Sequence, residues 1–129
     1  MHRTVRTALT LAALIGFSAT AQAAIQNGWP LLAFAQEQGC ELEIAGNGRF
    51  LEIRAMGLIP GESVRITVTN GDMTPFTRQI FANGSGDSKL LYIPFRFGQP
   101  GGTVGARIEA SRCTMTASAP WTRAVRVID

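Results

Sequence analysis

Two glutamates, Glu41 and Glu43, are the residues of this sequence whose spacing is best suited to acid–base chemistry. In an extended strand, residues two positions apart project from the same face, roughly 6–7 Å from each other. Glycoside hydrolases hold their two catalytic carboxyl groups at about that separation. A small carboxylate-based hydrolase using Glu41 and Glu43 is therefore one hypothesis. Alternating glutamates also occur simply because one side of a strand faces water, and we favour this second interpretation.

Other catalytic groups are scarce in this sequence. The only histidine is His2 and the only lysine is Lys89. Ser-His-Asp and Cys-His catalysis and the usual zinc sites all need a histidine. The stretches 70–72 and 83–87 gather oxygen ligands of the kind that calcium binds, but each contains one carboxylate and turn formation explains both. We therefore expect no enzymatic activity, no cofactor and no metal site.

Residues 1–23 have the pattern of a signal peptide. Arg3 and Arg6 precede the apolar run 7–19, and Ala21-Gln22-Ala23 provides the small-x-small pattern of a cleavage site. The apolar run is too short to stay in a bilayer as a spanning helix. We therefore expect an exported protein, periplasmic or extracellular, with no membrane span after cleavage. Loss of the two arginines lowers the net charge from +3 to +1, which argues against nucleic-acid binding.

Cys40 and Cys113 are the only two cysteines. In an exported protein, a single pair of cysteines most simply forms one disulfide. The alternative is a catalytic or metal-binding pair of thiols, but the CxxC spacing and a histidine partner are both missing. We predict a Cys40–Cys113 disulfide.

Apolar and polar residues alternate along most of the chain from residue 39 onward. The stretch 61–72, GESVRITVTNGD, is the clearest case, and the same period recurs in 40–44, 51–55 and 104–110. Alternation of this kind is typical of strands with one buried face. Asn-Gly pairs, which suit tight turns, begin at Asn27, Asn47, Asn70 and Asn83. Seven or eight short strands with regular turns and no convincing helix predict an all-β fold, a single antiparallel β-sandwich.

The chain is thus expected to consist of the signal peptide 1–23, an N-terminal arm 24–38 and a β-sandwich domain 39–129. The structure of the arm stays open, because the stretch 30–38, PLLAFAQEQ, fits a short helix, an extra strand or a flexible arm. Near the other end, we expect Pro120 to break the chain before a last short strand around 123–127.

The motifs AMGLIPGESVRITVTNGD and TVGARIEASRCTMTASAP give residues 49–119 a resemblance to exported bacterial immunoglobulin-like and fibronectin-type-III-like domains. The Cys, Trp, Cys order of antibody domains is absent, because Trp29 precedes both cysteines and Trp121 follows both. The resemblance implies an immunoglobulin-like sandwich with a role in adhesion, in binding a protein or glycan, or in the structure of the cell envelope.

Arginine and aromatic residues, which supply much of the binding energy at interfaces, are concentrated in the second half of the chain. If their strands share a face, they would form a basic patch, and the candidate residues of this surface are Arg78, Tyr92, Arg96 and Arg107. The alternative, which we favour, is that the charges pair across strands while the aromatics fill the core. We expect a non-catalytic binding or accessory module with a protein or glycan partner. A third possibility is an inhibitor-type protein acting through loop 83–88 or 97–102.

Overall fold

A computed structural model of the chain describes residues 28–96 and 98–123. The predicted signal peptide and Asn27 therefore lie outside the described residues. The described part is all-β and contains eight strands. They are β1 (Leu31–Glu37), β2 (Cys40–Gly46), β3 (Leu51–Met56), β4 (Ser63–Asn70), β5 (Phe76–Phe81), β6 (Ser88–Tyr92), β7 (Gly101–Glu109) and β8 (Thr114–Thr122). No helix long and apolar enough to cross a bilayer occurs within these ranges.

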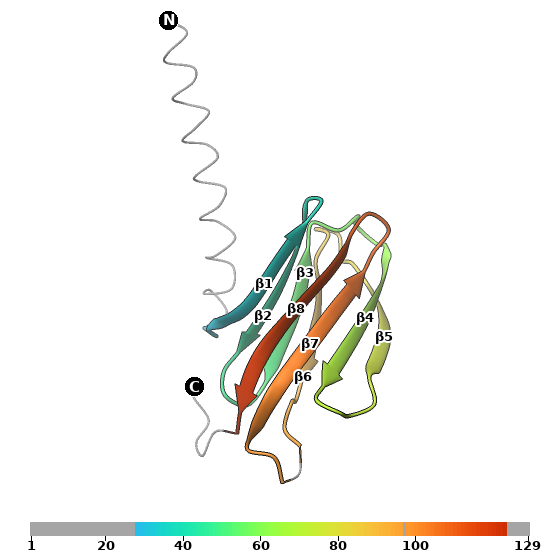
Figure 1. The fold of residues 1–129 in the computed structure, drawn as a ribbon. Helices are drawn as coiled ribbons and strands as arrows, with labels where there is room; N and C mark the ends of the chain where they lie inside the picture. The colour runs from blue at the N-terminus through green and yellow to red at the C-terminus, as the bar shows by residue number, and fades with distance from the viewer. Residues whose placement is uncertain (1–27, 97, 124–129) are drawn as a thin grey trace, which may run out of the picture.

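The strands form two antiparallel sheets of four, which confirms the predicted β-sandwich. Sheet A has the order β1-β2-β3-β6 and sheet B the order β5-β4-β7-β8. Figure 1 shows the strands of sheet B in front and those of sheet A behind them. The edge strands β1 and β8 pack against each other, which closes one side of the sandwich.

The core lies between the sheets and follows the alternation in the sequence. On β4, Val64, Ile66 and Val68 are fully buried, while Ser63 and Arg65 are exposed on the outer face. The facing layer comes from apolar residues at alternate positions of the central strands of sheet A, namely Leu42, Ile44, Leu51, Ile53 and Ala55. Alternation with period two places every second side chain on the same face, so each strand contributes one row to the core.

The predicted disulfide is confirmed. Cys40 and Cys113 are bonded, with a Cα–Cα distance of 6.4 Å and a sequence separation of 73. Cys40 begins β2 in sheet A, and Cys113 lies in the turn between β7 and β8 in sheet B. The bond therefore joins the two sheets at one end of the sandwich, which we call the disulfide end.

Of the three structures considered for residues 30–38, the extra strand is the one found. β1 pairs with β2 through a two-residue turn, Gln38-Gly39, in which both residues have positive φ (51° and 84°). Turns of this kind match the twist of a hairpin. Ala33 and Ala35 face the core from β1 and are partly buried against it. The sandwich therefore includes residues that the sequence assigned to an arm.

The Asn-Gly pairs occupy turns, but not all of them are hairpins. Asn47 lies between the adjacent strands β2 and β3, and its Oδ1 accepts hydrogen bonds from the backbone N–H groups of Arg49 and Phe50. Asn70 ends β4, which pairs with β5. Asn83 instead lies in a connection from sheet B to sheet A, where its Oδ1 accepts two backbone N–H groups.

The expectation that Pro120 interrupts the last strand is wrong. β8 continues through Pro120 to Thr122, with Pro120 opposite Thr103 of β7. β8 is an edge strand that pairs only with β7, and an edge tolerates the missing backbone N–H of proline. The predicted strand around 123–127 lies almost entirely outside the described residues.

Candidate functional site

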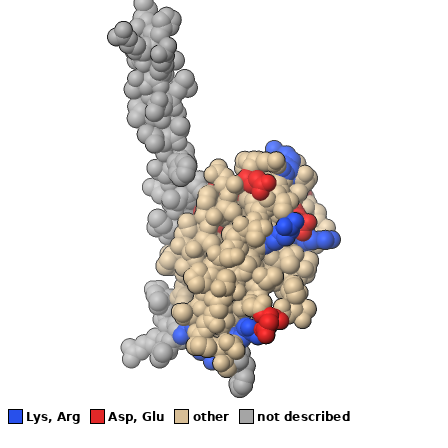
Figure 2. Space-filling model, in the orientation of Figure 1, with Lys and Arg blue, Asp and Glu red and all other residues tan. Residues whose placement is uncertain are grey.

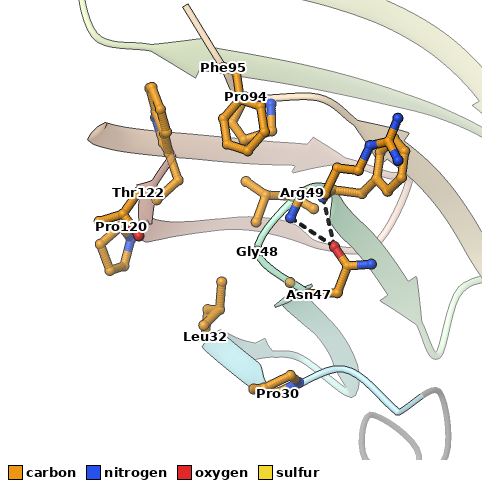
Figure 3. A pocket seen from close by; sticks show the side chains of 13 residues that line it. Pro30, Leu32, Asn47, Gly48, Arg49, Pro94, Phe95, Pro120 and Thr122 are labelled. Carbon is orange, nitrogen blue, oxygen red and sulfur yellow. Dashed lines mark hydrogen bonds between the residues drawn. The ribbon is translucent and has the colours of Figure 1, made fainter. Parts of the chain in front are cut away.

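A pocket of about 230 Å³ lies at the end of the sandwich opposite the disulfide. We call it the end pocket. Four segments that are far apart in sequence surround it: the start of β1, the β2–β3 turn, the segment after β6 and the end of β8. Figure 3 shows side chains from these segments around a common space, with Pro30 and Leu32 opposite Pro94 and Phe95.

The lining is mainly apolar and contains three prolines. It is formed by Pro30, Leu32, Gly46, Asn47, Gly48, Arg49, Phe50, Leu51, Pro94, Phe95, Pro120, Trp121 and Thr122. No carboxylate, histidine or cysteine is among these residues. Pockets lined by aliphatic and aromatic side chains with few polar groups are the usual sites for ligand binding.

Trp121 is the largest side chain of the end pocket, and it is fixed from two directions. Its indole N–H donates to Oδ1 of the buried Asn70 at 3.0 Å, and Nδ2 of Asn70 donates to the carbonyl of Pro94 at 2.5 Å. The ring also contacts Phe95, with centroids 5.7 Å apart and planes inclined by 55°. Asn70 thus links β4, β8 and the segment after β6 through side-chain hydrogen bonds.

The β2–β3 turn forms another wall of the end pocket. The two hydrogen bonds accepted by Asn47 hold this turn, and Gly48 adopts a φ of +91° that other residues rarely take. Phe50 contacts two neighbours: the ring centroid of Trp29 lies 6.5 Å from its own with planes inclined by 14°, and the guanidinium of Arg49 lies 5.1 Å from its ring centroid. Aromatic side chains from three parts of the chain therefore surround one end of the molecule.

The charges near the end pocket are mainly basic. The guanidinium of Arg123 lies 5.8 Å from the ring centroid of Phe95 and donates to the carbonyl of Arg96. Nη2 of Arg96 donates a hydrogen bond to Oδ1 of Asp72 at 2.5 Å. This bond holds the pKa of the Asp72 carboxyl below its usual value. Arg49 has no carboxylate within ion-pair distance among the described residues.

The four residues predicted for a binding surface are spread over several parts of the fold. Arg78 lies on β5 and Arg107 on β7, where they project to opposite faces of sheet B. Tyr92 ends β6 and packs partly buried against the core, whereas Arg96 lies near the end pocket. Arg107 is 3.6 Å from Glu109. On the face seen in Figure 2, basic and acidic side chains form small mixed groups among uncharged residues.

Glu41 and Glu43 share the outer face of sheet A, but Glu43 is not the solvated residue that the sequence indicates. Its exposure is 2%, and neither carboxylate oxygen has a hydrogen-bond partner among the described residues. Burial raises the pKa of Glu43, and the charge of Arg54 on the neighbouring strand opposes this only in part. Neither glutamate lines the end pocket.

The sequence analysis does not predict the end pocket. Asn70 was interpreted only as a turn residue, and Trp121 only as a departure from the antibody pattern. The available signal was the set of proline–aromatic neighbours Trp29-Pro30, Pro94-Phe95 and Pro120-Trp121. These pairs lie at strand ends that the sheet topology brings to the same end of the sandwich.

Comparisons with protein-family models, with curated proteins and with solved structures found no match to this chain. The fold and the site define a disulfide-bonded antiparallel β-sandwich with an apolar pocket at one end.

Proposed function

We propose that the chain is an exported, non-catalytic binding module that takes an apolar side chain of a partner protein into the end pocket. The observation that supports this proposal is the pocket itself, whose walls combine prolines, leucines and aromatic rings held in fixed positions. Its volume of about 230 Å³ lies below the range of about 300–1,000 Å³ that is typical for whole small-molecule ligands. The space therefore suits one or two side chains.

The polar groups of the pocket favour a protein partner over a glycan. A sugar ring presents many hydroxyls, and a site for it needs side chains free to bond them. Here the Oδ1 of Asn47 already accepts two backbone N–H groups, and the indole N–H of Trp121 is bonded to Asn70. Apart from Arg49 and Thr122, the remaining lining consists of apolar side chains and glycines, which suits a leucine or an aromatic side chain.

The lining also supports the non-catalytic part of the proposal, because its described residues include no carboxylate, histidine or cysteine. Export is supported by the N-terminal sequence pattern and by the disulfide, since disulfides persist in oxidising compartments. The resemblance to immunoglobulin-like and fibronectin-type-III-like exported domains agrees with a binding or accessory role.

The proposal can be tested by NMR titration of the labelled protein with N-acetyl-tryptophanamide, N-acetyl-leucinamide and the disaccharide cellobiose. We expect the two amino-acid amides to shift the backbone resonances of the β2–β3 turn and of residues 94–95 and 120–122. Shifts produced only by cellobiose would instead favour a glycan. Absence of shifts at these positions with any of the three probes at millimolar concentration would contradict the proposal.

Two adjacent leucines provide a matched pair of variants for the same titration. Leu31 and Leu32 are exposed to nearly the same degree, 38% and 39%, but only Leu32 lines the end pocket. Leu32→Trp fills the pocket and should abolish the shifts. Leu31→Trp adds the same side chain outside the pocket and should leave them unchanged.

A further inference from the structure

β5 is an edge strand whose side chains are exposed even on the side that faces the core. Among the described strands, β5 pairs with β4 alone. Phe76, Arg78 and Ile80 lie opposite the buried residues of β4, on the core side of sheet B. Nevertheless Phe76 is 36% exposed, Arg78 is exposed and Ile80 is only partly buried. Figure 1 shows the reason, since β5 is at the margin of sheet B, beyond the strands of sheet A. The core side of β5 is therefore uncovered.

The other three sheet edges are protected in ways that β5 is not. β1 and β8 pack against each other, and β8 contains Pro120. β6 is a short strand of five residues that carries Lys89 and is soon followed by Pro94. Proteins use short strands, proline and charged side chains, especially lysine, to keep sheet edges from pairing with other chains. β5 has six residues, FTRQIF, with no proline and no lysine, and Arg78 is its single charge.

Exposed apolar side chains are concentrated on the same side of the molecule. Of the nine large hydrophobic residues that are exposed in the described part of the chain, five lie on β5, on the turn before it, or on β6 and the residue that follows it. They are Met73, Phe76, Phe81, Leu91 and Ile93. Phe81, at the end of β5, is the most exposed of the nine at 69%. Phe81 lies opposite Ser63 on the outer face of sheet B and Leu91 lies opposite Glu52 on the outer face of sheet A, so these residues flank the β5 edge and do not form one patch. Of the five, Phe76 is the one on the core side of β5.

The charge on this edge indicates which partner fits it. Arg78 is the only charged residue of β5, and its guanidinium lies back over the ring of Phe76, 5.0 Å from the centroid. No carboxylate of the described residues lies within ion-pair distance of Arg78. A second copy of this chain that paired symmetrically about Arg78 would place a second Arg78 directly opposite the first, and like charges in opposite positions destabilise strand pairing. A strand with an acidic residue complements the edge.

We propose that β5 pairs along its free edge with an extended segment of a partner protein, which alternates apolar residues and places a carboxylate opposite Arg78. The backbone of the segment would continue sheet B as a fifth strand, in the mode of recognition in which a peptide adds to a sheet edge. Its apolar side chains would cover Phe76 and Ile80 on the core side. This surface is separate from the end pocket and does not depend on the function proposed for it.

Two synthetic peptides test the proposal. Each has ten residues of alternating valine and threonine, with one central glutamate in the first peptide and one central lysine in the second. Hydrogen exchange of the full chain with the glutamate peptide should protect the amides of β5 and leave those of β1 and β8 unchanged. Because a cross-strand charge pair contributes roughly 0.2–1 kcal/mol and a like-charge pair costs a similar amount, the glutamate peptide should bind about fivefold more tightly than the lysine peptide.

Reversing the charge at position 78 tests whether Arg78 itself recognises the peptide or whether only the net charge of the protein matters. Arg78→Glu should reverse the preference, so that the lysine peptide binds more tightly. Arg107→Glu makes the same change of net charge on the opposite face of sheet B and should keep the preference of the unchanged protein. Equal affinity of both peptides, or protection away from β5, would overturn the proposal. Concentration-dependent dimerisation in sedimentation experiments that Phe81→Lys abolishes would also overturn it, because the edge would then bind a second copy.

Discussion

The indole N–H of Trp121 donates to Oδ1 of Asn70 at 3.0 Å, although 51 positions of sequence separate the two residues. Asn70 is 3% exposed, and its other side-chain group donates to the carbonyl of Pro94. One buried amide therefore satisfies a donor and an acceptor that belong to two other segments. An asparagine at the end of a strand, usually explained by turn formation, is here the structural centre of the pocket end.

Replacing Asn70 should be costly for this reason. Asn70→Ala leaves the indole N–H and the Pro94 carbonyl buried without partners, and we expect the free energy of unfolding to fall by about 2–3 kcal/mol. Urea denaturation followed by tryptophan fluorescence measures this loss. Thr69→Ala, at the exposed neighbouring position, should change it by less than about 0.5 kcal/mol. An equal effect of the two variants would contradict the structural role given to Asn70.

Glu43 should destabilise the folded protein at neutral pH, because its buried carboxylate loses its hydration and forms no hydrogen bond with the described residues. Glu43→Met is expected to raise the free energy of unfolding at pH 7 by about 1 kcal/mol. Glu37→Met changes the same residue type at an exposed position of β1 and should have no such effect. Chemical denaturation of both variants at pH 7 provides the comparison.

The same substitution has a defined pH dependence. The pKa of Glu43 is raised above its ordinary value of 4.5 in the folded protein, mainly by burial. The folded state therefore binds the proton more tightly than the unfolded state, so its stability relative to Glu43→Met increases as the pH falls through the folded pKa toward 4.5. The advantage of Glu43→Met should shrink across this window and be smallest below 4.5. An advantage that grows on acidification would show that the charge of Glu43 stabilises the fold.

Glu62 should behave in the opposite way. One of its carboxylate oxygens accepts from the backbone N–H and the hydroxyl of Ser111, each at 2.9 Å, and the other accepts from the backbone N–H of Ile59 at 2.6 Å. These bonds, above all the backbone N–H of Ser111, lower the pKa of Glu62 below its ordinary value of 4.5. Glu62→Gln should cost on the order of 1 kcal/mol at pH 7. The difference should persist down to about pH 4.5 and disappear as the pH falls through the folded pKa. Thermal unfolding from pH 7 to pH 2.5 measures it.

Gly57 and Gly61 allow backbone strain to be separated from steric overlap. Both have positive φ, +76° and +79°, so alanine at either position should cost about 1–2 kcal/mol of conformational strain. A Cβ at Gly57 would also lie 2.3 Å from the carbonyl oxygen of Gly39, whereas a Cβ at Gly61 meets nothing within 4 Å. Gly57→Ala should therefore lower the melting temperature clearly more than Gly61→Ala. Similar losses would mean that the β1–β2 turn moves freely to accommodate the new methyl group.

The fold could be predicted from the sequence wherever large apolar residues alternate with polar ones. β4 is such a case, because Val64, Ile66 and Val68 define its buried face without ambiguity. The sequence does not decide whether β1 is a strand or a helix. The residues of β1 that face the core are the small Ala33 and Ala35, which give only a weak apolar alternation. Its turn is Gln38-Gly39 rather than an Asn-Gly pair, although both types adopt positive φ there.

The candidate site could not be predicted in the same way, because a pocket depends on which strand ends meet in space. Trp29, Phe50 and Trp121 belong to three segments, and only the strand order brings them to one end. The burial of the Glu43 side chain could not be predicted from the sequence either. Alternation assigns a residue to the outer face of a sheet, but it does not say how far its cross-strand neighbours cover that face.

The position of the disulfide decides how this protein would respond to being stretched. The bond encloses residues 40–113, so a pulling force applied through the two chain ends would pass through the two sulfur atoms and bypass everything between them. Only β1, which precedes Cys40, and β8, which follows Cys113, could peel away. Because those two strands also contribute Leu32 and Trp121 to the end pocket, tension would act on the pocket first and place no load on the six enclosed strands.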